Sequence, residues 1–220
     1  NQFIQHRLYR NNGEADFKKD PASFPVNFSN IAVAVPMDYD SDGDLDLFVG
    51  GRNMSYSYGI DPYSYIYEND GKGKFTDITE KLNPLISKIG MVTNAVWTDV
   101  TGDKKNELVI VGEWMAPHVF GFNNGKLEEL KTNLSNLSGW WQSIAVGDMD
   151  GDGDNDMVLG NYGDNFYLKP DSVNPVKLWV NDFDVNSIPD KVFSRTVNGK
   201  DVTVFLKKDF TDAMPAMKKE

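Results

Sequence analysis

The sequence predicts an all-β protein made of four-stranded antiparallel β-propeller blades, and three observations support this. An acidic loop recurs along the chain, short apolar or alternating segments flank it, and Asn-Gly or Asp-Gly turns follow. One unit reads as strand, acidic loop, strand, strand, hairpin turn and strand. Units of this kind, about 40 to 60 residues long and stacked side by side, are typical of propellers.

The most regular acidic loop begins the segment Asp148 to Gly160. Its places one, three, five, seven and nine are Asp148, Asp150, Asp152, Asp154 and Asp156. Gly153 stands at place six, where calcium loops need a sharp turn. In such loops, side chains at places one, three and five, a backbone carbonyl at place seven and a ligand at place nine surround the ion. Place twelve is Leu159 rather than the glutamate of an EF-hand, and the apolar run around it predicts a strand.

Three further loops follow the same spacing. Asp38 to Gly50 matches it fully, with Asp38, Asp40, Asp42, Asp44 and Asp46, and with Gly43 at place six. Asp99 to Gly112 is a weaker copy, with Asp99, Thr101, Asp103, Lys105 and Glu107 at the five ligand places and Lys104 at place six. Asp182 to Asp190 has Asp182, Asp184, Asn186, Ile188 and Asp190, with Ser187 at place six. At Lys105 and Ile188 only the backbone carbonyl would serve. We expect Ca²⁺ in the two full loops, rather than merely solvated acidic turns, and leave calcium in the two weaker loops open.

The flanking segments divide the chain into blades. Apolar or alternating runs precede three of the loops, and hairpin turns at Asn12-Gly13, Asp70-Gly71 and Asn124-Gly125 follow the pattern of positive-φ turns. We expect one β-propeller fragment over residues 1–220, of about four blades and belonging to a longer protein. Its parts are a partial blade 1–28, blades 29–85 and 90–134, a blade or blades over 139–208 and a linker 209–220. Short helices are expected only near residues 80–85 and 209–219, the second limited by Pro215.

The acidic residues are concentrated in the four loops, so the net charge does not indicate a charged partner. The net charge is −11, yet 16 of the 33 acidic residues lie in the four loops; the other 17 face 22 Lys and Arg, which gives +5 outside the loops. No basic stripe predicts nucleic-acid binding. The chain has no cysteine, which excludes disulfides and thiolate metal sites, and no apolar run approaches the roughly 18 residues of a membrane helix.

The loops DYDSDGDLDLFVGG and DMDGDGDNDMVLGN and the hairpins LYRNNG and YENDGKGKFTD resemble the FG-GAP/VCBS repeats of integrin α-like β-propellers. The segments VGEWMAPHVF and LWVNDFDVNSIPD look more narrowly like secreted bacterial VCBS-repeat proteins of the ASPIC/UnbV, cartilage-acidic-protein group. The resemblance implies a calcium-stabilised propeller, exported or displayed at the cell surface, that binds a protein or glycan ligand. The integrin-type FG and GAP signatures are poorly kept, so integrin-like partner recognition is not implied.

Two aromatic groups are candidates for ligand contact. Trp140 and Trp141 with Gln142 could form a glycan-stacking platform, although alternation along a strand would bury one ring. An aromatic stretch offers Tyr56, Tyr58 and Tyr63, whose alternative role is sheet packing.

Catalysis has little support in the sequence. The only histidines, His6 and His118, are not part of a nucleophilic arrangement. The loop carboxylates are committed to a cation, and Glu113 and Trp114 are the first candidates if an enzyme is considered. We therefore expect a non-enzymatic, extracellular, periplasmic or cell-surface binding module in which calcium is structural. The alternative is a glycan-binding lectin or the propeller domain of a polysaccharide lyase or hydrolase.

Overall fold

The computed structural model describes residues 5–27, 29–55, 57–163 and 166–215. The chain divides into two compact units, which are described separately. The first unit comprises Asn1–Met54 and Asp61–Asn161, and the second comprises Ser55–Ile60 and Tyr162–Glu220.

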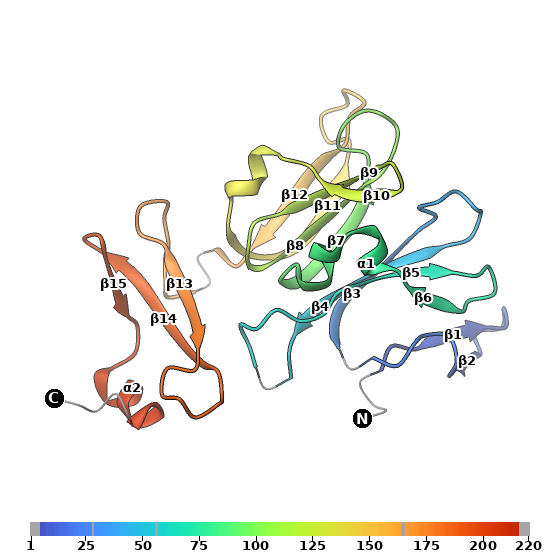
Figure 1. The fold of residues 1–220 in the computed structure, drawn as a ribbon. Helices are drawn as coiled ribbons and strands as arrows, with labels where there is room; N and C mark the ends of the chain where they lie inside the picture. Colours follow the sequence, from blue (N-terminus) through green and yellow to red (C-terminus); the bar gives the residue numbers. More distant parts are fainter. Residues whose placement is uncertain (1–4, 28, 56, 164–165, 216–220) are drawn as a thin grey trace. The chain divides into compact units, whose positions relative to one another are not determined.

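The described residues of the first unit form three antiparallel sheets (Figure 1). A hairpin pairs β1 (Leu8–Asn11) with β2 (Phe17–Asp20). A four-stranded sheet has the order β3 (Asn30–Met37), β4 (Asp46–Asn53), β5 (Tyr65–Asn69) and β6 (Phe75–Asp77). The third sheet joins β7 (Met91–Thr98), β8 (Glu107–Met115), β9 (His118–Asn123), β10 (Lys126–Glu129), β11 (Gly139–Gly147) and β12 (Asp156–Asn161). The order strand, acidic loop, strand, strand, turn, strand is present twice, in β3–β6 and in β7–β10, which confirms the all-β, blade-type prediction.

The second unit contains one three-stranded antiparallel sheet and a helix. Its strands are β13 (Val176–Asn181), β14 (Asp190–Val197) and β15 (Lys200–Thr203), and its helix is α2 (Lys207–Ala213). The buried residues of this unit, among those that the structure describes, are Val192 and Ser194 of β14, Thr211 of α2, Leu168 and Met214. Helix α2 ends two residues before Pro215, as expected, because the residue before a proline disfavours helical geometry.

The second strand of each repeat carries the core of the first unit. The side chains of β8 from Leu108 to Val111 are all fully buried, as is Phe48 of β4. Of these, Leu108, Ile110 and Phe48 pack in one cluster with Ile66 of β5 and Phe120 of β9. Continuous burial of this kind explains why these strands are uninterrupted apolar runs, whereas the outer β10 alternates.

Short helices and turns connect the strands where the sequence permits them. Helix α1 (Thr79–Leu82) and the 3₁₀ helix η1 (Pro84–Lys88) cover the expected helical turn, and a second 3₁₀ helix, η2 (Asn133–Asn136), precedes β11. Positive φ angles at Gly13, Gly71, Asn124 and Gly125 place the predicted hairpin turns between β1 and β2, β5 and β6, and β9 and β10. No helix among the described residues is long and apolar enough to cross a membrane. The boundaries proposed for the individual blades and the linker stay a prediction.

Truncating the core should destabilise the first unit strongly. Because Phe48 is fully buried, Phe48→Ala should cost about 3–5 kcal/mol of unfolding free energy in a denaturant titration. Phe17 is 58% exposed, so Phe17→Ala is the matched control and should change stability by no more than about 0.5 kcal/mol. Equal effects of the two substitutions would contradict this placement of the core.

A partly buried histidine, His6, should make the first unit sensitive to acid. His6 lies edge-on to the rings of Phe24, Tyr65 and Tyr67, with Nδ1 3.4 Å from the Tyr67 hydroxyl. Its Nε2 is buried and has no hydrogen-bond partner among the described residues. Burial lowers the pKa of His6 from 6.5 to about 4.

Between pH 6.5 and about 4, His6 is therefore protonated in the unfolded chain but neutral in the folded chain. The free energy of unfolding should fall as the pH falls through this window. His6→Phe keeps an aromatic ring and removes the titration. Chemical denaturation from pH 7.5 to 4 should give a shallower loss of stability for this variant than for the parent. Parallel curves would show that His6 titrates alike in both states.

Candidate metal centres

The four acidic loops occupy equivalent places in the fold. They join β3 to β4, β7 to β8, β11 to β12 and β13 to β14, each connecting two antiparallel neighbours. A strand follows every loop, as the sequence predicts, and no EF-hand helix is present at these positions. The first three loops lie in the first unit and the fourth in the second.

The aspartate at place one organises each loop by accepting backbone N–H groups on both carboxylate oxygens. In the first loop, Asp38 accepts from Asp42 N at 3.1 Å and from Gly43 N at 3.1 Å. In the third loop, Asp148 accepts from Gly151 N at 2.7 Å and from Gly153 N at 3.0 Å. Asp99 and Asp182 make the corresponding bonds in the second and fourth loops. The weaker sequences therefore retain the same turn.

Two other ligand places are fixed by the same kind of contact. The carboxylate at place nine accepts the N–H of place two in all four loops, at distances from 2.9 to 3.3 Å. The side chain at place five accepts the N–H of place seven in all four, at 2.7 to 3.0 Å. These bonds hold the carbonyl of place seven in a defined turn, including that of Lys105 and Ile188.

The turn requires positive φ at places four and six of every loop. Gly43 and Gly153 adopt φ values of 95° and 99° at place six, where Lys104 and Ser187 adopt 67° and 66°. Place four is also left-handed in every loop, at the residues Ser41, Gly102, Gly151 and Val185. A β-branched residue such as Val185 rarely adopts φ of 61°, so the fourth loop holds a strained backbone.

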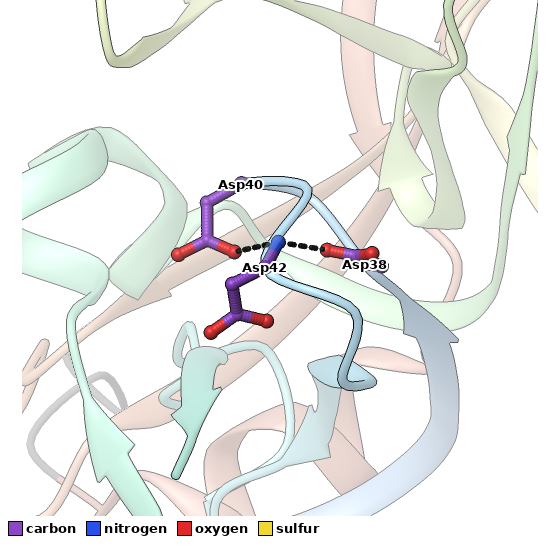
Figure 2. Close-up of side chains that lie close together, drawn as sticks. All are labelled: Asp38, Asp40 and Asp42. Carbon is purple, nitrogen blue, oxygen red and sulfur yellow. Dashed lines mark hydrogen bonds between the residues drawn. The ribbon is translucent and has the colours of Figure 1, made fainter. Parts of the chain in front are cut away.

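Three of the four loops bring carboxylates close enough to share one cation. The groups are Asp38, Asp40 and Asp42, then Asp148, Asp150 and Asp156, and finally Asp182, Asp184 and Asp190. Within each group the ligand oxygens lie within 4.8 Å of one another. Calcium–oxygen distances of about 2.3–2.6 Å allow ligand oxygens up to about 5 Å apart, so these groups fit a calcium ion. Figure 2 shows the first group, with the backbone nitrogen of Asp42 donating to Asp38 and Asp40.

The second loop departs from the other three. Thr101 replaces the aspartate at place three, and no group of three close carboxylates forms at this loop in the part of the chain that the structure describes. The Lys105 ammonium instead lies 3.8 Å from Asp103. Burial alone would raise the pKa of Asp99, but backbone N–H donors from Lys104, Gly102 and Thr101 outweigh it and hold this pKa low.

Crowding and burial disfavour ionisation in the first loop. Burial raises the pKa of Asp46 to about 6, although the N–H groups of Asn69 and Tyr39 partly oppose the shift. Burial also raises the pKa of Asp44, and the charges of Asp42 and Asp40 add to the effect. The Oδ1 atoms of Asp44 and Asp184 are buried and have no hydrogen-bond partner among the described residues. Asp184 belongs to the carboxylate group of the fourth loop, where a buried acceptor amid like charges fits a hard divalent cation.

The predicted aromatic contacts are dispersed. Tyr56 lies outside the described residues, and Tyr58 belongs to the second unit. Tyr63 belongs to the first unit, where the Lys88 ammonium lies 3.5 Å from its ring centroid. Trp141 donates its indole N–H to the Leu137 carbonyl at 3.0 Å.

The structure brings together two groups that the sequence analysis treats separately, Glu113 with Trp114 and Trp140 with Gln142. The rings of Trp114 and Trp140 meet edge to face, with centroids 4.9 Å apart. Glu113 Oε1 accepts from Arg52 at 2.7 Å and from Gln142 at 3.0 Å. Arg52 is absent from the sequence-based candidates because a single arginine at the end of a strand carries no recognisable signal.

A family model for FG-GAP-like repeats matches residues 38–110 and 99–159. Both matches begin at place one of an acidic loop, and together they span more than half of the 220 residues. The chain belongs to the FG-GAP-like repeat family. The repeat model thus includes the second loop of this chain together with the two full loops.

Among solved structures, the chain is similar to a lectin of Agrocybe aegerita, described as recognising non-reducing terminal N-acetylglucosamine. The identity is 17% and the TM-score 0.45, over 96% of this chain and 63% of the lectin chain. The FG-GAP-like chain thus spans less than two thirds of that structure's length. No curated protein matches the chain.

Removing the place-one carboxylate should abolish one calcium site. Asp148→Asn leaves a single side-chain acceptor for Gly151 and Gly153 and removes one of the three clustered charges. Isothermal titration calorimetry should detect one fewer calcium ion per chain. Asp154→Asn is the matched control: place seven contributes its backbone carbonyl, so this variant should retain the parent stoichiometry. Loss of a site in the control but not in Asp148→Asn would refute the ligand assignment.

Proposed function

We propose that this FG-GAP-like chain is a calcium-stabilised, non-enzymatic binding module of the β-propeller type. The observation that carries the proposal is the shared loop geometry. In all four loops the side chains at places one, five and nine accept the N–H groups of places six, seven and two, and three of these loops gather carboxylates around one point. Four copies at equivalent connections favour a structural task over a single reactive metal.

The role of the ion is to relieve repulsion at the strand ends. In the first loop three carboxylates approach one another directly after β3, and Asp46 begins β4. A divalent cation among them would neutralise the charges and tie the two strands together. The stabilisation then grows with the logarithm of the calcium concentration, reaching about 2.7 kcal/mol per site at one hundred times the dissociation constant.

We further propose an extracellular, periplasmic or cell-surface location, a protein or glycan ligand, and a relationship to secreted bacterial VCBS-repeat proteins of the ASPIC/UnbV group. The support is the sequence resemblance together with the loop chemistry, because calcium sites that fill at millimolar concentration suit extracellular modules.

The proposal that the module is not an enzyme rests on the surroundings of its candidate groups. Glu113 is engaged by Arg52 and Gln142, and His118 Nδ1 lies 2.6 Å from Glu129 at a partly exposed site. His6 packs among aromatic rings. Incubation with polysaccharides should release neither reducing ends nor unsaturated products; steady release by the purified chain would instead support a carbohydrate-active enzyme.

Calcium should raise the thermal stability of both units. Differential scanning calorimetry with 5 mM calcium, and then with excess chelator, should show a reversible increase in Tm of several degrees. A kcal/mol of stabilisation corresponds to roughly 2–8 °C for domains of this size. Magnesium at the same concentration is the control and should stabilise less, because it resists dehydration. An unchanged Tm in chelator would refute the calcium role.

A further inference from the structure

We propose that a cluster formed by Arg52, Glu113, Trp114, Trp140 and Gln142 is a binding site for neutral saccharides. The inference deepens the proposed binding function by naming a ligand class and a place. All five residues belong to the first unit. They come from the end of β4, the end of β8 and the beginning of β11.

Strand pairing places the cluster at the opposite end of the sheets from the acidic loops. In the β7–β8 pair, Thr98 faces Glu107 at the loop end, and Met91 faces Glu113 at the other end. Trp140 of β11 is also opposite Glu113. In the β3–β4 pair, the far end is marked by Asn30 opposite Asn53, beside Arg52. A ligand here would not compete with calcium for the same carboxylates.

Three of the five residues are the extra residues of register shifts. Arg52 is inserted where Asn30 and Ile31 face Asn53 and Gly51. Trp114 is inserted where Gly139 and Trp140 face Met115 and Glu113, and Gln142 where Trp141 and Ser143 face Asn161 and Gly160. Such bulges re-aim side chains out of the regular alternation, and they are frequent beside functional sites.

The backbone is strained at Trp114, the extra residue of the β8–β11 register shift. Its φ is 63°, in the left-handed region that a large aromatic residue rarely adopts. The strain accompanies the edge-to-face contact of Trp114 with Trp140. Outliers of this kind persist where the surrounding structure holds them, commonly at ligand sites.

The polar groups of the cluster suit hydroxyl recognition. The Arg52–Glu113 ion pair is largely withdrawn from solvent, with side-chain exposures of 30% and 11%. The Nη1 atom of Arg52 is a buried donor without a hydrogen-bond partner among the described residues, and a hydroxyl or carbonyl oxygen of a ligand would satisfy it. Because Glu113 already balances the arginine charge, a neutral ligand fits better than an anionic one.

The two aromatic rings supply the apolar half of the site. Trp114 and Trp140 are both partly exposed; Trp114 follows Glu113 in β8, and Trp140 is the strand partner of Glu113 in β11. A pyranose ring has an apolar C–H face and a rim of hydroxyls, so it can contact indole rings and hydrogen-bond the neighbouring polar groups at the same time. This combination favours a saccharide over a purely apolar or purely charged ligand.

The test uses the calcium-loaded full chain on immobilised cellohexaose, mannohexaose and chitohexaose, with hexagalacturonate as the anionic arm. At least one neutral oligosaccharide should bind, and calorimetry should then give its Kd. Trp140→Ala and Arg52→Ala should each weaken that Kd by about tenfold or more, a loss of about 1.4 kcal/mol. Gln142→Ala is a milder variant whose effect should have the same sign.

Trp179→Phe is the matched control, because Trp179 lies on β13 of the second unit and is 45% exposed. It should bind like the parent. Each variant must keep the calcium-induced rise in Tm, which shows that it is folded. Absence of neutral binding, binding confined to hexagalacturonate, or binding unchanged by the Trp140 and Arg52 variants would overturn the site. If Tm still rises with calcium in those cases, the saccharide inference fails alone; if it does not rise, the proposed calcium role fails separately.

Discussion

The structure depends on one local constraint, the aspartate that accepts two backbone N–H groups at the start of each acidic loop. Because Asp38 and Asp148 each bind the amide of place six as well as an earlier amide, the chain must turn within a few residues. That turn brings the next strand back antiparallel to the previous one. It also brings several carboxylates close together, and a bound cation can offset their electrostatic repulsion.

The sequence could predict this constraint because it is local and strictly spaced. Five acidic residues at alternate positions with Gly43 or Gly153 between them identify the turn, and the following apolar run identifies a buried strand. Counting carboxylates was less informative for the weaker loops, since they contain three each. In the structure the fourth loop gathers its acids and the second does not, because Thr101 interrupts the second loop at place three whereas Asp184 keeps that place in the fourth.

The cluster around Glu113 could not be predicted as a unit for a different physical reason. Sequence alternation assigns a face to each residue only while the register of the sheet is regular. The shifts at Arg52, Trp114 and Gln142 break that alternation, so the direction of these side chains depends on pairing with neighbouring strands. Trp114 and Trp140 are 26 positions apart in the chain and touch only because β8 and β11 pair at their ends. The sequence therefore offered Glu113 and Trp114 separately from Trp140 and Trp141.

The two ends of the strands therefore differ in structure and in their proposed roles. At one end, short-range hydrogen bonds fix acidic turns that we propose are stabilised by a cation. At the other end, about six residues or roughly 20 Å away along β8, irregular pairing presents rings and a paired arginine and carboxylate. The hydrogen bonds that shape the turn lie within the nine residues of each loop, although Asp46 also accepts from Asn69 N. A blade can therefore vary its far end without disturbing the turn. Under the proposed function, calcium would act on the far end only through the strands that it ties together, so ligand affinity should follow the folding of the unit rather than the occupancy of any single loop.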